Sequence, residues 1–144
     1  MIIVLFGQPH SGKTTLAKQL PFDHHIDGDS MRHVFKNTNY TKEGRLQNLN
    51  RASDIATYLS YQGLNVVMSL VYPYKEARDY LNSLNSDVKW VFLKYEKEEV
   101  RGRENFHVAD FEYPYLDENV LQLNTSKLSE KECIEKIKSY VSQS

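Results

Sequence analysis

Short, continuously apolar runs alternate along the chain with longer segments that are apolar on one side only. The run at residues 2–6 is rich in β-branched side chains and is followed by Gly7, as expected of a strand buried on both faces. Over residues 42–62, apolar side chains recur at steps of three and four residues, which predicts an amphipathic helix. The same reasoning predicts strands at residues 2–6, 24–27, 64–71, 88–95 and 121–123. It predicts helices at residues 13–20, 30–36, 42–62, 74–84 and 129–141, and a further helix that begins within residues 96–103.

Strands that alternate with helices predict an α/β fold. Such a chain forms a mostly parallel sheet of five strands with helices on both faces, in three layers. No internal repeat, low-complexity segment or linker rich in proline and glycine interrupts the pattern. We therefore expect one domain over residues 1–144.

Composition narrows the class of protein. Of the 144 residues, 40% are hydrophobic and 26% are charged, so a hydrophobic core is expected. The formal net charge of -1 argues against a dedicated nucleic-acid surface, which usually carries a basic excess. Residues 1–6 are the longest apolar stretch, far below the roughly 20 residues that span a bilayer, and Cys133 is the single cysteine. We expect a cytoplasmic protein without a membrane partner or an internal disulfide, and the oligomeric state stays open, a homodimer included.

A phosphate-binding pattern follows the first strand directly. Residues 7–14 match G-x-x-x-x-G-K-[ST], in which backbone N–H groups surround phosphate oxygens, the lysine reaches the β- and γ-phosphates, and the threonine hydroxyl binds Mg²⁺. The alternative is a glycine-rich turn with an exposed lysine, and the position between a buried strand and a helix argues against it. The sequence therefore predicts binding of a nucleoside triphosphate. The expected nucleotide-binding residues are Gly7, Gln8, Pro9, His10, Ser11, Gly12, Lys13, Thr14 and Thr15.

The acidic residues favour a small phosphotransferase over other nucleotide-binding proteins. The chain lacks the D-x-x-G and N-K-x-D sequences of a GTPase, and residues 66–69 contain no carboxylate of the kind that closes a strand in motor ATPases. Acids follow the second strand instead, at Asp27 and Asp29. A carboxylate there can accept a proton from an acceptor hydroxyl and help to hold Mg²⁺. The alternative is an ordinary turn rich in aspartate and glycine.

Further polar and aromatic residues follow the acidic turn in a distinctive order. In chain order they are Arg32, Tyr40, Arg45 with Asn48 and Arg51, residues 69–74 (Ser-Leu-Val-Tyr-Pro-Tyr) with Arg78, residues 111–114 (Phe-Glu-Tyr-Pro) and residues 123–125 (Leu-Asn-Thr). Together with the phosphate-binding loop and Asp27-Gly28-Asp29, this order resembles the adenylylsulfate (APS) kinase family. The resemblance covers most of the chain.

The resemblance implies a P-loop NTPase fold, with ATP as the phosphoryl donor, Mg²⁺ as the cofactor and adenosine 5′-phosphosulfate as the small-molecule acceptor. Lys13 and Asp29 are then catalytic, and Thr14 and Asp29 bind the metal. The implied substrate-binding residues are Asp29, Arg32, Tyr40, Arg45, Asn48, Val71, Tyr72 and Phe106, with Arg101 at the nucleotide. Tyr40 would stack on the acceptor's adenine and Phe106 would cover the opposite side. The alternative is that the arginines form a solvated face and that the two aromatic residues belong to the core.

The chain departs from the family pattern at three places. The long lid is reduced to a remnant at about residues 101–115, Tyr72 stands where the family has a serine before the proline, and Asn124 replaces an acid. Arg101 and Arg103 are expected either to supply charge to the transferring phosphoryl group or to stabilise a helix C-terminus. Two alternatives to APS phosphorylation therefore stay open: a kinase of the same core with another hydroxyl acceptor, and a nucleotide-binding module without transfer activity.

Overall fold

A five-stranded parallel sheet forms the centre of the protein. The computed structural model describes residues 1–95 and 107–143. The strands are β1 (Ile2–Phe6), β2 (His24–Asp27), β3 (Val66–Ser69), β4 (Val88–Lys94) and β5 (Val120–Asn124), in the spatial order β2-β3-β1-β4-β5. The helices are α1 (Lys13–Ala17), α2 (Gly28–Phe35), α3 (Lys42–Tyr61), α4 (Lys75–Leu84) and α5 (Glu130–Ser142).

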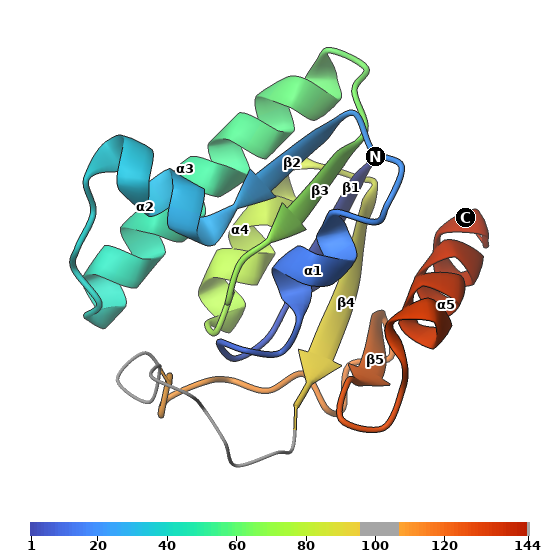
Figure 1. Ribbon diagram of the computed structural model, residues 1–144. Helices are drawn as coiled ribbons and strands as arrows, with labels where there is room; N and C mark the ends of the chain where they lie inside the picture. The colour runs from blue at the N-terminus through green and yellow to red at the C-terminus, as the bar shows by residue number, and fades with distance from the viewer. Residues whose placement is uncertain (96–106, 144) are drawn as a thin grey trace.

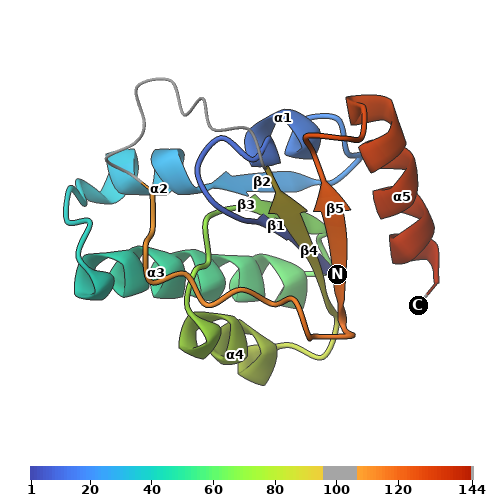
Figure 2. The same cartoon turned by 90° about the horizontal axis from the view of Figure 1, so that it is seen from below.

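The helices cover both faces of this sheet and make three layers (Figures 1 and 2). Side chains alternate along β1, so Ile2, Val4 and Phe6 pack against α3 and α4, whereas Ile3 and Leu5 pack against α1 and α5. α2 lies on the side of α3 and buries Met31 in the same cluster as Ile2. The predicted α/β fold is therefore confirmed.

The observed elements differ from the predicted ones mainly at their ends. α1 ends at Ala17 rather than near residue 20, because the N–H groups of Gln19 and Leu20 donate to carbonyls three residues back, in tighter turns. α2 begins two residues earlier than predicted, because the Asp27 side chain accepts from the Ser30 N–H and caps the helix. β3 is shorter than the predicted strand at residues 64–71. The helix expected to begin within residues 96–103 lies outside the described residues.

The parallel arrangement brings the carboxyl ends of the strands to one edge of the sheet. In α/β proteins ligands bind in the crevice at this edge, where the strand order reverses. Here β1 and β3 are neighbours, and the phosphate-binding loop and Ser69 lie at their carboxyl ends. Among the helices of residues 1–95 and 107–143, none has the length and apolarity needed to cross a membrane.

Candidate active site

The loop between β1 and α1 has the backbone shape that its glycines permit. Gly12 has a φ of +93°, in the left-handed region, where a side chain would be strained. A Cβ on Gly7 would collide with the carbonyl oxygen of Leu93 on β4. These two positions therefore need glycine for backbone reasons, as the sequence pattern implied.

Lys13 lies across this loop. Its Nζ donates to the Gln8 carbonyl at 2.9 Å, to the Gly7 carbonyl at 3.2 Å and to the Ser11 hydroxyl at 3.3 Å. Thr125, after β5, donates from its hydroxyl to the Ser11 carbonyl at 3.0 Å. The ammonium group is thus held over the segment that would surround a phosphate group.

The Gln8 side chain contacts protein rather than the inside of the loop. Its Nε2 donates to the Val108 carbonyl at 2.8 Å, and its Oε1 accepts from the Val108 N–H at 2.9 Å. The same Nε2 lies 2.9 Å from the hydroxyl of Tyr113. Gln8 therefore fixes residues 107–115, here called the return segment, against the phosphate-binding loop.

Asp27 lies beside Thr14 at the entrance to the loop. Its Oδ1 accepts from the Thr14 hydroxyl at 2.8 Å and from the Ser69 hydroxyl at 2.9 Å, and its Oδ2 accepts from the Ser30 N–H at 3.3 Å. Burial alone would raise the pKa of Asp27, but these hydrogen bonds and the nearby His25 outweigh burial and hold it below its ordinary value. The carboxylate closest to Thr14 is consequently Asp27, whereas the sequence analysis paired Thr14 with Asp29.

Asp29 has a different environment. It is exposed and lies in the first turn of α2, and its carboxylate forms no hydrogen bond or ion pair with another described residue. Because Asp27 is occupied and Asp29 is available, the two carboxylates suit different tasks. Both residues line the pocket, but Asp27 is hydrogen-bonded to Thr14 and Ser69, whereas Asp29 has no such bond within the described residues.

A pocket of about 660 Å³ collects most of the predicted site residues. The predicted residues that line it are Pro9, His10, Gly12, Lys13, Thr14, Thr15, Asp29, Arg32, Tyr40, Arg45, Asn48 and Val71. Asp27, which the sequence analysis named beside Asp29 as an acid of this turn, lines it as well. Lining residues that were not predicted are Gly28, Leu49, Ser69, Leu70, Pro73 and Val108. Of these, Gly28, Ser69 and Leu70 lie at or directly after the carboxyl end of a strand, and that position is the signal which could have identified them.

The Arg32 side chain is hydrogen-bonded to residues that follow it closely in the sequence. One guanidinium nitrogen donates to the Asn37 carbonyl at 3.2 Å, to the Asn37 side-chain oxygen at 3.2 Å and to the Asn39 carbonyl at 3.1 Å. The guanidinium also lies 3.9 Å from the centre of the Tyr40 ring. Burial lowers the pKa of Arg32, with the nearby Arg45 acting in the same direction, but an arginine stays protonated. One face of the Tyr40 ring is therefore already covered by a cation.

Arg45 and Asn48 face the pocket from α3. The Arg45 side chain forms no hydrogen bond or ion pair with another described residue. Asn48 is only 5% exposed, and its side-chain oxygen has no hydrogen-bond partner among residues 1–95 and 107–143. A buried acceptor without a partner is costly, so this oxygen suits a ligand that brings a donor. Arg51 points elsewhere and lies over the Phe35 ring at 4.8 Å, so the three residues of R-x-x-N-x-x-R do not share one face.

The assignment of Tyr72 to the substrate is wrong for its side chain. Tyr72 is fully buried, its ring meets Trp90 edge-on at 5.3 Å, and its hydroxyl lies 2.7 Å from that of Ser53. Burial raises the pKa of this hydroxyl above its ordinary value. The large apolar ring favours the core, which the position of the residue in the motif did not reveal. The predictions for Arg101, Arg103 and Phe106 lie outside the described residues.

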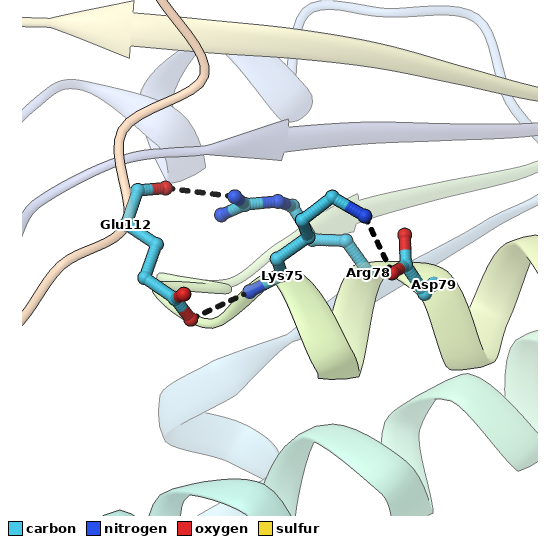
Figure 3. Close-up of polar contacts among 4 residues, drawn as sticks. All are labelled: Lys75, Arg78, Asp79 and Glu112. Carbon is cyan, nitrogen blue, oxygen red and sulfur yellow. Dashed lines mark hydrogen bonds and ion pairs between the residues drawn. The ribbon is translucent and has the colours of Figure 1, made fainter.

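A second anchor holds the return segment against α4 (Figure 3). The buried Arg78 guanidinium donates to the Tyr72 carbonyl at 2.8 Å and to the Glu112 carbonyl at 2.7 Å. Glu112 also donates its N–H to the Pro73 carbonyl at 2.7 Å and accepts the Lys75 N–H on its carboxylate at 3.0 Å. Pro73 and Val108 form one wall of the pocket. Arg78 and Glu112 do not line the pocket, but their hydrogen bonds hold the segments that carry this wall.

The sequence that builds this site is similar to those of known proteins. Residues 1–106 match the family described as adenylylsulphate kinase. The chain belongs to the adenylylsulphate kinase family. An adenylyl-sulfate kinase of Clostridium kluyveri is 23% identical over an alignment of 169 positions, gaps included. The alignment covers 99% of this chain and 83% of that relative.

The fold of this chain is also similar to those of solved kinase structures. The Mycobacterium tuberculosis APS kinase CysC, in complex with AMPPNP and APS, superposes with a TM-score of 0.81 at 19% identity, covering 98% of this chain and 96% of that one. A sugar kinase from Janibacter sp. superposes with a TM-score of 0.75 at 19% identity, covering 98% of this chain and 94% of that one. At such identities the likeness establishes a shared fold.

Proposed function

We propose that this kinase transfers the γ-phosphoryl group of ATP to the 3′-hydroxyl of adenosine 5′-phosphosulfate, giving 3′-phosphoadenosine 5′-phosphosulfate. The observation that carries the proposal is one pocket lined by Lys13 and Thr14, by the available carboxylate of Asp29, and by Arg45 with Asn48. Phosphoryl transfer requires mainly positioning and charge stabilisation, which such a set can supply. Membership of the adenylylsulphate kinase family supports this acceptor.

ATP would bind along the loop from Gly7 to Thr15, with Lys13 turning from the loop carbonyls to the β- and γ-phosphates. The Thr14 hydroxyl and the Asp27 carboxylate lie together and are oxygen donors, which suit Mg²⁺. Bound Mg²⁺ supplies positive charge to the phosphate oxygens. Asp27 therefore takes the metal role that the sequence analysis gave to Asp29. Arg101 stays a prediction for the nucleotide.

Asp29 would act as the general base. As the acceptor oxygen attacks the γ-phosphorus, its proton moves to the Asp29 carboxylate, and the bond from the γ-phosphorus to the β–γ bridging oxygen breaks to release ADP. The exposed carboxylate in the pocket has the freedom to meet an acceptor hydroxyl. Lys13 stabilises the charge that develops on the transferring group.

The acceptor would bind between α2 and α3. Arg45 has no side-chain partner within the described residues and can bind an anionic group, and the Asn48 oxygen, unpaired in the same part of the chain, suits a donor such as an amine or hydroxyl. Tyr40 lines the pocket beside the Arg32 guanidinium, and an aromatic ring at this place can stack against an adenine. Val71 adds an apolar wall, and Phe106 stays a prediction for the opposite side.

A second acceptor class follows from one observation. The Arg32 guanidinium donates hydrogen bonds to Asn37 and Asn39. Within the part of the chain that the structure describes, Arg45 is therefore the pocket arginine whose side chain has no protein acceptor. A single free guanidinium beside an unpaired amide oxygen also fits a smaller polyhydroxylated anion, such as a sugar acid. This acceptor is the alternative that the experiment must separate.

The test is product formation by the purified protein. ATP and Mg²⁺ are supplied with adenosine 5′-phosphosulfate or with a panel of sugars, sugar acids and other nucleotides, and products are identified by mass spectrometry. Formation of 3′-phosphoadenosine 5′-phosphosulfate supports the proposal. Phosphorylation of another compound with none of this product would transfer the function to that acceptor. Nucleotide binding without any product would assign a binding module.

A further inference from the structure

Four polar side chains form a continuous hydrogen-bonded row from the sheet edge to the phosphate-binding loop. His25 and Asp27 are two positions apart on β2, so their side chains point to the same face of the sheet. Ser69, at the end of β3, is paired with Asp27. The His25 Nε2 lies 2.6 Å from the Ser69 hydroxyl, Ser69 donates to Asp27 at 2.9 Å, and Thr14 donates to the same Asp27 oxygen at 2.8 Å. The row joins an exposed edge strand to the residue expected to meet the nucleotide.

The direction of these hydrogen bonds follows from counting protons. An ionised carboxylate only accepts, so the hydroxyl protons of Thr14 and Ser69 both point at Asp27. A serine hydroxyl has one proton, and Ser69 donates it in the hydrogen bond to Asp27. Ser69 must therefore accept from His25, which places a proton on the His25 Nε2.

This proton has a structural consequence for Asp27. A serine hydroxyl rotates freely and could turn its proton toward another acceptor. A donor at 2.6 Å on its far side holds the Ser69 oxygen in place and directs its proton to Asp27. Outer partners of this kind orient the groups that bind a metal, and their loss typically weakens metal affinity about 10- to 100-fold.

We propose that His25 is a positioning residue which, through Ser69, holds the Asp27 carboxylate toward Thr14 and thereby sets the affinity for the metal–nucleotide complex. The inference rests on the proposed function only as far as binding of Mg²⁺ with a nucleotide. It does not depend on which acceptor is phosphorylated.

The test compares three variants by calorimetric titration with ADP, with and without Mg²⁺. His25→Phe keeps a ring but removes the donor, His25→Gln keeps an N–H at a similar reach, and His24→Phe is the matched control on the same strand. We expect His25→Phe to weaken ADP binding about tenfold in Mg²⁺ and to leave binding without Mg²⁺ unchanged. His25→Gln should stay within about threefold of the parent protein, as a restored donor predicts, and His24→Phe should bind like the parent.

A second measurement needs no variant. The ¹⁵N chemical shifts of the His25 ring in the parent protein should place its proton on Nε2. A proton on Nδ1 alone, or His25→Phe losing equal affinity with and without Mg²⁺, would overturn the inference, as would Mg²⁺-independent ADP binding by the parent. Failure to make 3′-phosphoadenosine 5′-phosphosulfate, in contrast, would bear on the acceptor and leave these outcomes intact.

Discussion

Replacing Arg78 by methionine should strongly destabilise the protein. The side chain is 9% exposed, and its guanidinium donates to two backbone carbonyls, those of Tyr72 at 2.8 Å and Glu112 at 2.7 Å. A hydrogen bond from a charged group contributes roughly 1.5–3 kcal/mol, and a buried acceptor without a donor keeps its desolvation cost. Methionine fills much of the space but donates nothing, so the free energy of unfolding should fall by about 3–5 kcal/mol.

The loss can be converted into a melting temperature. Unfolding entropy near 60 °C is about 2 cal/mol/K per residue, so each kcal/mol lowers the melting temperature of a chain this size by about 3 °C. The Arg78→Met variant should therefore melt about 10–15 °C below the parent protein in differential scanning calorimetry. Urea unfolding at fixed temperature gives the free energy directly.

Lys75 provides a matched control on the same helix (Figure 3). Its Nζ pairs with Asp79 at 2.7 Å, but the two side chains are 71% and 56% exposed, so Lys75→Met should cost about 0–1 kcal/mol. Arg78→Lys keeps the charge but reaches one carbonyl at most, so it should recover about half of the loss. A loss below about 1 kcal/mol for Arg78→Met, or one equal to that of Lys75→Met, would refute the reasoning that the two carbonyls depend on this guanidinium.

Three further changes test the proposed chemistry by steady-state kinetics. Lys13→Ala should lower kcat/KM more than about tenfold, a loss above 1.4 kcal/mol, with the melting temperature nearly unchanged; a smaller loss would remove Lys13 from the reaction. Asp29→Asn should lower kcat strongly and leave ATP affinity nearly unchanged, because it removes the base and not the metal-side carboxylate of Asp27; an unchanged kcat would leave Asp29 as a turn residue. Arg45→Ala should raise the acceptor KM about 10- to 100-fold and spare the KM for ATP, and an equal effect on both would contradict its place at the acceptor.

The elements of the fold could be predicted because each carries its own local signal. β1 is apolar at every position and α3 repeats at helical spacing, so neither depends on distant residues for recognition. Boundaries were less accurate where a side chain decides them. The start of α2 depends on the Asp27 cap, which moves it to Gly28.

The site could be predicted in outline because the phosphate-binding loop is contiguous in sequence. The choice between Asp27 and Asp29 could not be settled in this way, because both are acids in one turn and differ only in what packs beside them. Hydrogen bonds from Thr14 and Ser69, which arrive from two other elements, distinguish Asp27. Tyr72 was misplaced for a similar reason, since its burial against Trp90 is a long-range contact that a motif position does not reveal.

The double fastening of the return segment ties the pocket wall to two elements that are distant in the sequence. Val108 is held at the pocket by Gln8, and Glu112 is held by Arg78, so the pocket wall takes its position from the phosphate-binding loop and α4. Both fastenings are made by side chains of the phosphate-binding loop and of α4, which are far apart in the sequence. A change in either element is therefore transmitted to the same wall, and the wall registers the relative position of the two.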